Sequence, residues 1–313
     1  MMQVPSAAEI DGALSVPFVV CPHCGNGMTG FGLGLIDDFL MGKSLRCERC
    51  CSTTDAWAAF LATISHSNPF IRDKASLFVG YKTKTFSVLV APGGTTEINF
   101  HEHGVPQGSR ILRLNYTPTG AGVHPIELHS NDVPLRRKRG NVFLYGKSPY
   151  PPVGGLAQPP VKVTVYAVFA EAAADEYALA ALASAFAALA VKEFVEMVIP
   201  ATMAVEFTCK RLINDLKTAL SLDITGIKDK ELLPDVVARH IAVAVDVPEL
   251  TSEILQKVAR LWGQRDNVAH RGHLHQPYDQ TNGAPQLAAA VFAFRYCQLL
   301  RREAEAKGLL PTP

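Results

Sequence analysis

The sequence feature that constrains the fold most is a pair of Cys-x-x-Cys motifs near the N-terminus. Cys21 and Cys24 form the first motif, Cys47 and Cys50 form the second, and 22 residues separate the two. Two such motifs supply the four thiolates that Zn²⁺ holds at tetrahedral corners, and a site filled entirely by protein ligands is structural. We therefore predict a zinc ribbon with one structural Zn²⁺ and no metal for catalysis.

Two alternatives stay open for this cysteine cluster. Cys51 directly follows Cys50 and can replace it as the fourth ligand, although the spacing favours Cys50. A Cys-x-x-Cys motif can also be a redox pair. The last two cysteines, Cys209 and Cys297, stand alone in helical patterns. This usage is typical of a reducing compartment, and we expect a cytoplasmic protein.

The charge and the hydropathy of the chain exclude two classes of protein. The formal net charge is +1, with +4 in residues 1–170 and −3 in residues 171–313. Neither half has the basic excess of a protein that coats nucleic acid, so any such contact should be local. The longest uncharged apolar stretch, 177–191, has 15 residues and is too short to span a membrane. We expect no signal peptide in the first residues, because Asp11 interrupts the first weakly apolar run.

Three consecutive regions differ in their sequence pattern and predict a multidomain α+β protein. Residues 1–66 hold the predicted zinc ribbon. Residues 67–171 contain short runs that alternate apolar and polar residues between Gly, Pro, Asn and Asp, which predicts an antiparallel β-sandwich for recognition or regulation. The predicted strands are Ala75–Tyr81, Phe86–Ala91, Thr96–Phe100, Ile111–Tyr116, Pro125–His129, Asn141–Tyr145 and Val161–Phe169, with a long loop at Ser148–Pro160.

Residues 172–313 have the apolar spacing of helices and predict a C-terminal α-helical bundle. Pro200 is expected to end or kink the first helix, and Gly272 to cap the fourth. The predicted helices are about Ala173–Val198, Thr202–Leu220, Pro234–Val245, Thr251–Gly272 and Pro285–Lys307.

The end of the fourth predicted helix reads Arg265-Asp266-Asn267-Val268-Ala269-His270-Arg271-Gly272. Metal-free cleavage of RNA needs a base, an acid and a cation; histidine transfers protons near neutral pH, and arginine binds phosphate oxygens with two donors. Five residues of straight helix point Arg265 and His270 about 140° apart. Either the helix is irregular here, or two chains contribute to one site. Asp266 lies four residues before His270, an offset suited to orienting the imidazole.

This Arg-x4-His motif, with Asp266 after the arginine, resembles the signature of the HEPN superfamily over about residues 172–308. The resemblance implies a metal-independent endoribonuclease that acts on RNA as a homodimer or higher homo-oligomer and leaves a 2′,3′-cyclic phosphate. In it, Arg265 stabilises the charge on phosphorus, His270 is the general base or acid, and Asp266 and Asn267 support them. It also implies a bacterial toxin or anti-phage abortive-infection effector with a phage or protein trigger.

Two other interpretations of the helical region stay open. Many HEPN relatives are not catalytic, so the alternative function is a module that binds nucleic acid or protein and dimerises through its bundle. The bundle can also be unrelated to HEPN, with Arg265 and Asp266 forming an exposed ion pair. Four further groups are candidate sites for which a solvated surface is the simpler explanation: His270, His273 and His275; Glu206, Lys210 and Arg211; Arg136, Arg137, Lys138 and Arg139; and His101, Glu102 and His103.

Overall fold

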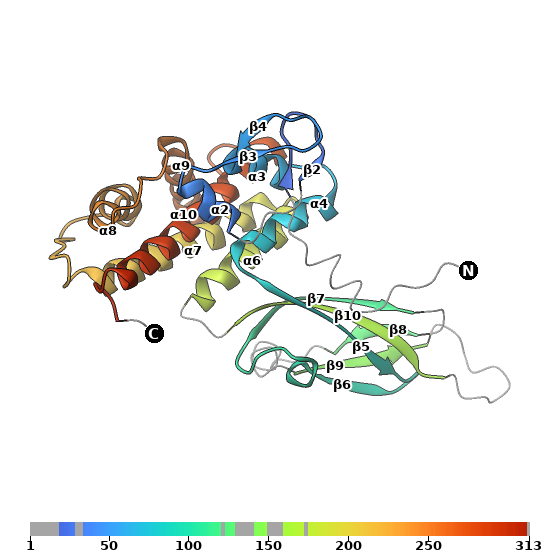
Figure 1. Ribbon diagram of the computed structural model, residues 1–313. Helices are drawn as coiled ribbons and strands as arrows, with labels where there is room; N and C mark the ends of the chain where they lie inside the picture. Colours follow the sequence, from blue (N-terminus) through green and yellow to red (C-terminus); the bar gives the residue numbers. More distant parts are fainter. Residues whose placement is uncertain are drawn as a thin grey trace. The chain divides into compact units, whose positions relative to one another are not determined.

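The computed structural model describes residues 19–28, 34–119, 123–128, 141–148, 159–171 and 175–311 (Figure 1). It combines helices and strands and divides into two compact units. The β unit comprises Tyr81–Glu176, and the helical unit comprises Pro17–Gly80 together with Tyr177–Pro313. The cysteine region therefore shares a unit with the C-terminal helices, although the β unit separates them in sequence. The predicted division into three consecutive regions, with boundaries at residues 66 and 171, differs from this division.

The described part of the β unit contains two three-stranded antiparallel sheets. Side chains of both sheets share one core, to which Phe86 and Val165 come from the first sheet and Ile98 and Leu144 from the second. Six of the seven predicted strands correspond to these strands. The first sheet has the order β5 (Lys82–Val90), β10 (Val161–Ala170), β7 (Arg110–Pro118), and the second the order β6 (Thr95–Asn99), β9 (Asn141–Lys147), β8 (His124–Glu127).

The strand predicted at Ala75–Tyr81 is wrong. Ala75–Val79 forms a 3₁₀ helix, η1, directly after α4 (Pro69–Lys74). Ala75, Phe78 and Val79 are fully buried, so this run is apolar without alternation. A short buried helix and a short buried strand have the same sequence pattern, so the pattern of this run did not distinguish a helix from the predicted strand.

The cysteine region consists of two short hairpins and two helices. The hairpins join β1 (Val19–Val20) to β2 (Gly27–Met28), and β3 (Ser44–Arg46) to β4 (Thr53–Asp55). The helices are α2 (Leu35–Leu40) and α3 (Ala56–Ile64). Asp55 begins α3 by accepting from the Ala58 N–H at 2.7 Å. The Thr63 hydroxyl of α3 accepts from the Val20 N–H at 2.9 Å and ties the first hairpin to the helix.

The C-terminal part is helical, as predicted, but its first helix boundary is not at Pro200. Pro200 lies inside α7, and the chain instead breaks at Lys192, which has a φ of 64°. The buried guanidinium of Arg72 donates to the Ala190 carbonyl at 3.1 Å and so satisfies the helix end before this break. The elements are α6 (Glu176–Ala190), α7 (Phe194–Leu216), η4 (Asp229–Glu231), the π-helix η5 (Leu232–Ile241), α8 (Ala242–Val245), α9 (Ser252–Arg271) and α10 (Gln280–Ala306).

The predicted helices of residues 173–198 and 202–220 are accordingly wrong in their bounds, because α7 spans the proline between them. Met197, Val198 and Ala201 are fully buried around Pro200, so packing outweighs the lost backbone hydrogen bond. No helix in the described residues combines the length and the hydropathy needed to cross a lipid bilayer.

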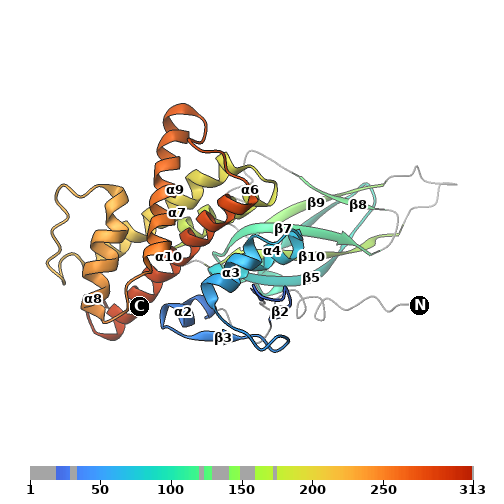
Figure 2. The same ribbon diagram turned by 90° about the horizontal axis from the view of Figure 1, so that it is seen from above.

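An aromatic cluster joins the cysteine region to the C-terminal helices, where α2 and α3 lie beside α10 (Figure 2). Phe292 of α10 meets Phe39, Trp57 and Phe60 edge to face, with ring centroids 5.2, 4.9 and 5.5 Å away. Each such pair adds about 0.5–1.5 kcal/mol beyond the burial of its surface. The helical unit therefore has one core, to which both ends of the described chain contribute.

An ion cluster strengthens the same contact. Asp37 of α2 accepts from Arg295 at 2.8 Å and from Arg302 at 3.0 Å, and both arginines lie on α10. Arg295 and Asp37 are about 15% exposed, so this pair is well shielded from water. Charge-assisted bonds of this kind are stronger than neutral ones.

Candidate metal centre and candidate active site

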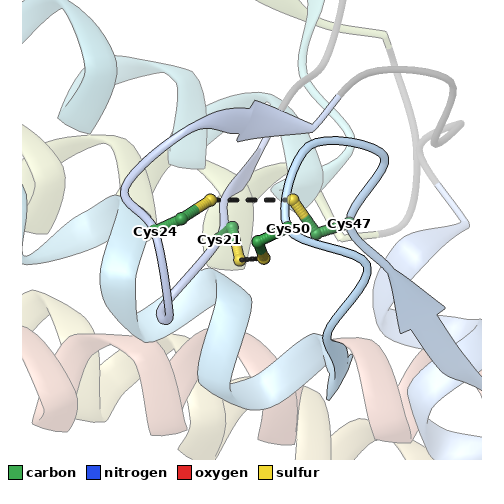
Figure 3. A group of neighbouring side chains, drawn as sticks. All are labelled: Cys21, Cys24, Cys47 and Cys50. Carbon is green, nitrogen blue, oxygen red and sulfur yellow. Dashed lines mark hydrogen bonds between the residues drawn. The ribbon is translucent and has the colours of Figure 1, made fainter.

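The thiols of Cys21, Cys24, Cys47 and Cys50 point toward one another from the two hairpins (Figure 3). All four sulfur atoms lie within 4.8 Å of one another. The Sγ atoms of Cys21 and Cys50 are 3.7 Å apart, and those of Cys24 and Cys47 are 3.8 Å apart. Four sulfurs held about 2.3 Å from a central Zn²⁺ form a tetrahedron with edges of about 3.8 Å. A disulfide requires about 2.05 Å, so the spacing suits a metal ion.

The two hairpins build their turns in the same way. In the first, the Gly25 N–H donates to the Cys21 carbonyl at 2.9 Å, and Gly25 has a φ of 71°. In the second, the Cys51 N–H donates to the Cys47 carbonyl at 2.8 Å, and Cys51 has a φ of 59°. Cys51 thus occupies the left-handed turn position that Gly25 fills in the first hairpin. It is exposed and outside the cluster, so the fourth ligand position belongs to Cys50.

The surroundings shift the pKa values of two of these thiols in opposite directions. Hydrogen bonds from the side chain and backbone of Ser52 lower the pKa of Cys50 to about 6. A backbone hydrogen bond from Asn26 lowers the pKa of Cys24, but desolvation and the three neighbouring thiols outweigh it and raise this pKa to about 11. A lower pKa favours the thiolate, which is the form that binds a metal. Cys21 and Cys47 are buried, whereas Cys24 is exposed.

The second candidate site, on α9, carries all four predicted catalytic residues. α9 is an uninterrupted α-helix, and Gly272 ends it as predicted, with a φ of 72° and its N–H bonded to the Val268 carbonyl. A regular helix keeps Arg265 and His270 about 140° apart. An irregular helix at this motif is therefore excluded, and the structure does not bring Arg265 and His270 together within one chain.

Arg265 is fixed against α7 by an ion network. Its Nη2 donates to Glu206 at 2.9 Å and its Nη1 to Asp266 at 3.0 Å, while Lys210 binds Glu206 at 2.6 Å and Asp229 at 3.0 Å. Burial lowers the pKa of Arg265, but hydrogen bonds and charges from Asp266 and Glu206 outweigh this and raise it above its ordinary value. Arg265 is 30% exposed, so it remains a fixed cation that a ligand can still reach.

His270 and Asn267 lie elsewhere on the α9 surface. His270 is exposed in the last turn. The Asn267 side-chain amide donates to the Gly263 carbonyl at 2.9 Å and lies along the helix. In the described contacts, Asp266 bonds to Arg265 and not to His270, so the predicted orientation of the imidazole by Asp266 is not formed in this structure.

The structure also bears on two of the other candidate groups. Among the described residues, the four cysteines are the only group of three or more His, Cys, Asp or Glu ligands close enough to share a metal, which excludes a site at His270, His273 and His275. In the β unit, His103 stacks on Phe86 with ring centroids 3.9 Å apart, and burial lowers the pKa of His103 despite the opposing charge of Glu102. The basic run at residues 136–139 lies outside the described residues.

Three contacts were not predicted from the sequence. Glu206, a candidate for which a solvated surface was the simpler prediction, holds Arg265. Gln264 is buried and holds the chain after α9 by accepting from the His275 N–H at 2.8 Å; a polar residue on an apolar helix face was the available signal. Cys209 and Cys297, expected to stand alone, are buried with their sulfurs 3.7 Å apart.

Comparison with protein-family models, with curated proteins and with solved structures found no match for this chain.

Proposed function

We propose that this protein is a metal-independent endoribonuclease of the HEPN type, with one structural Zn²⁺ held by Cys21, Cys24, Cys47 and Cys50. The observation that carries the proposal is the division of roles on α9. Arg265 is a fixed, partly accessible cation, and His270 is an exposed proton carrier about 1.4 turns later. The four-cysteine cluster supports a structural ion, because all four positions around it are taken by protein sulfur.

These residues can supply each chemical need of RNA cleavage. The 2′-hydroxyl loses a proton and attacks the adjacent phosphorus, and the 5′-oxygen leaves with a proton, which yields a 2′,3′-cyclic phosphate. His270 transfers protons as base or acid, because histidine exchanges them near neutral pH. Arg265 offers planar paired donors to the phosphorane-like charge. Asp266 keeps Arg265 in place, and Asn267 adds an amide beside His270.

A second copy of the chain completes the cleft in this proposal. α7 supports it with four apolar residues spaced four apart, Val195, Ile199, Met203 and Phe207, each 37–41% exposed. Residues at this spacing form one ridge, and two such ridges pack across a two-fold axis. Glu206, next to the end of this α7 ridge, is the residue that holds Arg265. A dimer packed on α7 therefore draws the Arg265 of one protomer toward its partner.

The biological setting follows from the same resemblance. A ribonuclease joined to a separate β unit fits a cytoplasmic bacterial toxin or an anti-phage abortive-infection effector. The β unit, a small sandwich in this proposal, then recognises a phage or protein trigger and controls cleavage. This control explains how a cell tolerates the enzyme before infection.

The test compares RNA cleavage by the purified wild-type protein with cleavage by His270→Ala, Arg265→Ala and the matched exposed control His273→Ala. The reactions contain EDTA at concentrations that leave the folded zinc site intact. We expect a loss of at least about 100-fold for the first two variants and wild-type activity for the control. The product ends should be 2′,3′-cyclic phosphates. Equal activity of all four proteins contradicts the proposal.

Mixing the inactive variants tests the composite cleft. A dimer of one His270→Ala chain and one Arg265→Ala chain keeps one cleft with both residues intact if the two residues come from different chains. Random exchange should then restore about a quarter of wild-type activity. No restoration contradicts a cleft in which the two chains each supply one of the two residues. Met203→Asp should yield a monomer by light scattering and lose cleavage, because it puts a charge in the centre of the α7 ridge.

One observation favours the alternative, a non-catalytic module that binds nucleic acid or protein. Arg265 is already neutralised by Glu206 and Asp266, as in a purely structural ion pair. In that case Arg265→Ala lowers stability, RNA remains intact with every variant, and Met203→Asp still dissociates the dimer.

A further inference from the structure

One exposed ridge of α9 joins His270 and Asn267 to three residues that have no role in the proposed catalysis. Arg260, Asn267 and Arg271 lie within about 40° of one another around the helix, and Gly263 and His270 follow at about 60–80° to one side. We call these five residues the α9 ridge. Asn267 is half-buried and the other four are exposed. From Arg260 to Arg271 the ridge extends about 17 Å along the axis.

The α9 ridge carries cations that are not neutralised. In the described part of the chain, the ion pairs of α9 join Lys257 to Glu253 and Arg265 to its two carboxylates. Arg260 and Arg271 are left as exposed cations on the ridge. The Asn267 amide adds a polar group between them, fixed to the Gly263 carbonyl. The ridge thus offers donors to an anion at both ends.

Gly263 provides room for close contact in the middle of the ridge. A Cβ added there meets nothing within 4 Å, so no neighbouring side chain explains the glycine. By contrast, a Cβ added at Gly283 of α10 lies 2.7 Å from the Phe194 ring, so packing requires that glycine. A helix-interior glycine costs about 1 kcal/mol relative to alanine. Where packing does not need it, a glycine suits the close approach of a ligand to the helix backbone.

We propose that the α9 ridge binds the phosphodiester backbone of single-stranded RNA and leads it to His270. The inference rests on the proposed ribonuclease function. Arg260 and Arg271 each bind one phosphate with paired N–H donors, and the strand crosses the helix closely at Gly263. At about 3.4 Å per stacked nucleotide, the ridge holds about five nucleotides. No large apolar side chain of α9 is exposed, which argues against a protein partner on this face.

The test measures the Kd of the full-length protein for a 2′-O-methyl oligoribonucleotide, which has no free 2′-hydroxyl to attack, across a series of KCl concentrations. Arg260→Ala/Arg271→Ala should weaken binding about tenfold or more and reduce the slope of log K against log salt by about 1.4, because two phosphate contacts are lost. Gly263→Trp should weaken binding to a similar extent with an unchanged slope, because it blocks approach and removes no charge. Arg239→Ala, which removes an exposed cation of η5 that pairs with Asp235, is the control for a general change in charge.

Thermal unfolding of each variant accompanies the measurement, and Gly263→Leu replaces Gly263→Trp if the latter unfolds. Wild-type Kd values for the ridge variants overturn the ridge proposal, whether or not the protein cleaves RNA. Weakened binding in a protein that never cleaves RNA keeps the ridge and refutes the ribonuclease. Cleavage with unaltered binding keeps the ribonuclease and refutes the ridge. The two proposals therefore fail separately.

Discussion

The four-cysteine cluster is complete within one chain, whereas the α9 motif is not. The cysteines lie in two hairpin turns that bring their sulfurs within 4.8 Å of one another. Arg265 and His270 lie on one straight helix, which separates them by about 140°. Two intervening residues therefore bring the paired cysteines together in a turn, whereas four intervening residues on a straight helix point Arg265 and His270 apart. The proposed cleft therefore requires a second chain, and the exposed apolar residues of α7 are the surface on which we propose that it packs.

The two sites also differ in how the fold supports them. The cysteine region shares a core with α10 through Phe292, so its stability and that of the bundle are linked. In the α9 motif, Arg265 is held by ion pairs with Glu206 and Asp266, while His270 is exposed. Loss of the first site should unfold the unit, and loss of the second should mainly change chemistry.

The largest effect should come from removing a zinc ligand. Cys47 is buried in the cluster, and Cys47→Ser should abolish binding of one zinc ion. Because the free energy of binding a structural zinc ion contributes to folding, we expect a loss of stability on the order of 5 kcal/mol or more and a Tm lower by at least about 10 °C. Metal content by atomic emission and unfolding by circular dichroism measure both.

Cys51→Ser is the control for this ligand set. Cys51 is adjacent to Cys50 but exposed and outside the cluster, so the variant should keep its zinc and its Tm. Loss of zinc in Cys51→Ser would show that the ligand assignment is wrong.

The next largest effect is expected at Phe292, and it tests whether the cysteine region and the C-terminal helices unfold together. Phe292→Ala removes the ring that contacts three aromatic side chains of the cysteine region, and should cost about 3–5 kcal/mol. Phe292→Leu should cost less, about 1–1.5 kcal/mol. Zinc release and the circular dichroism of the helices should report the same single transition when the protein is unfolded by denaturant. Zinc release well before the helices unfold would separate the two parts.

A smaller effect distinguishes the two residues of the α9 motif. Arg265→Ala leaves Glu206, whose side chain is 12% exposed, with Lys210 alone, and should cost about 1–3 kcal/mol. His270→Ala should change stability by less than about 0.5 kcal/mol, because the side chain is exposed. Chemical denaturation measures both variants. Wild-type stability of Arg265→Ala would contradict a structural contribution from Arg265.

The sequence predicted the parts of these sites that local spacing determines. The cysteine pairs, the Gly272 end of α9 and six strands followed from spacing, caps and alternation. What long-range packing decides was not predictable. The pairing of Arg265 with Glu206 joins residues 59 apart, and Asp37 meets Arg295 across 258 residues. Pro200 shows the same limit, since its local signal to end a helix is outweighed by the buried face of α7.

The smallest effect is expected for alanine substitutions at glycines inside two helices, Gly263 of α9 and Gly283 of α10. These substitutions test whether the folded structure itself requires Gly263 of the α9 ridge. Gly263→Ala should stabilise the protein by up to about 1 kcal/mol, because it improves helix propensity and its Cβ meets nothing within 4 Å. Gly283→Ala should not, because its Cβ lies 2.7 Å from the Phe194 ring and that contact offsets the gain in propensity. Differential scanning calorimetry resolves shifts of this size. If Gly263→Ala also destabilises the fold, the glycine serves the folded structure, and its openness no longer supports a ligand on the α9 ridge.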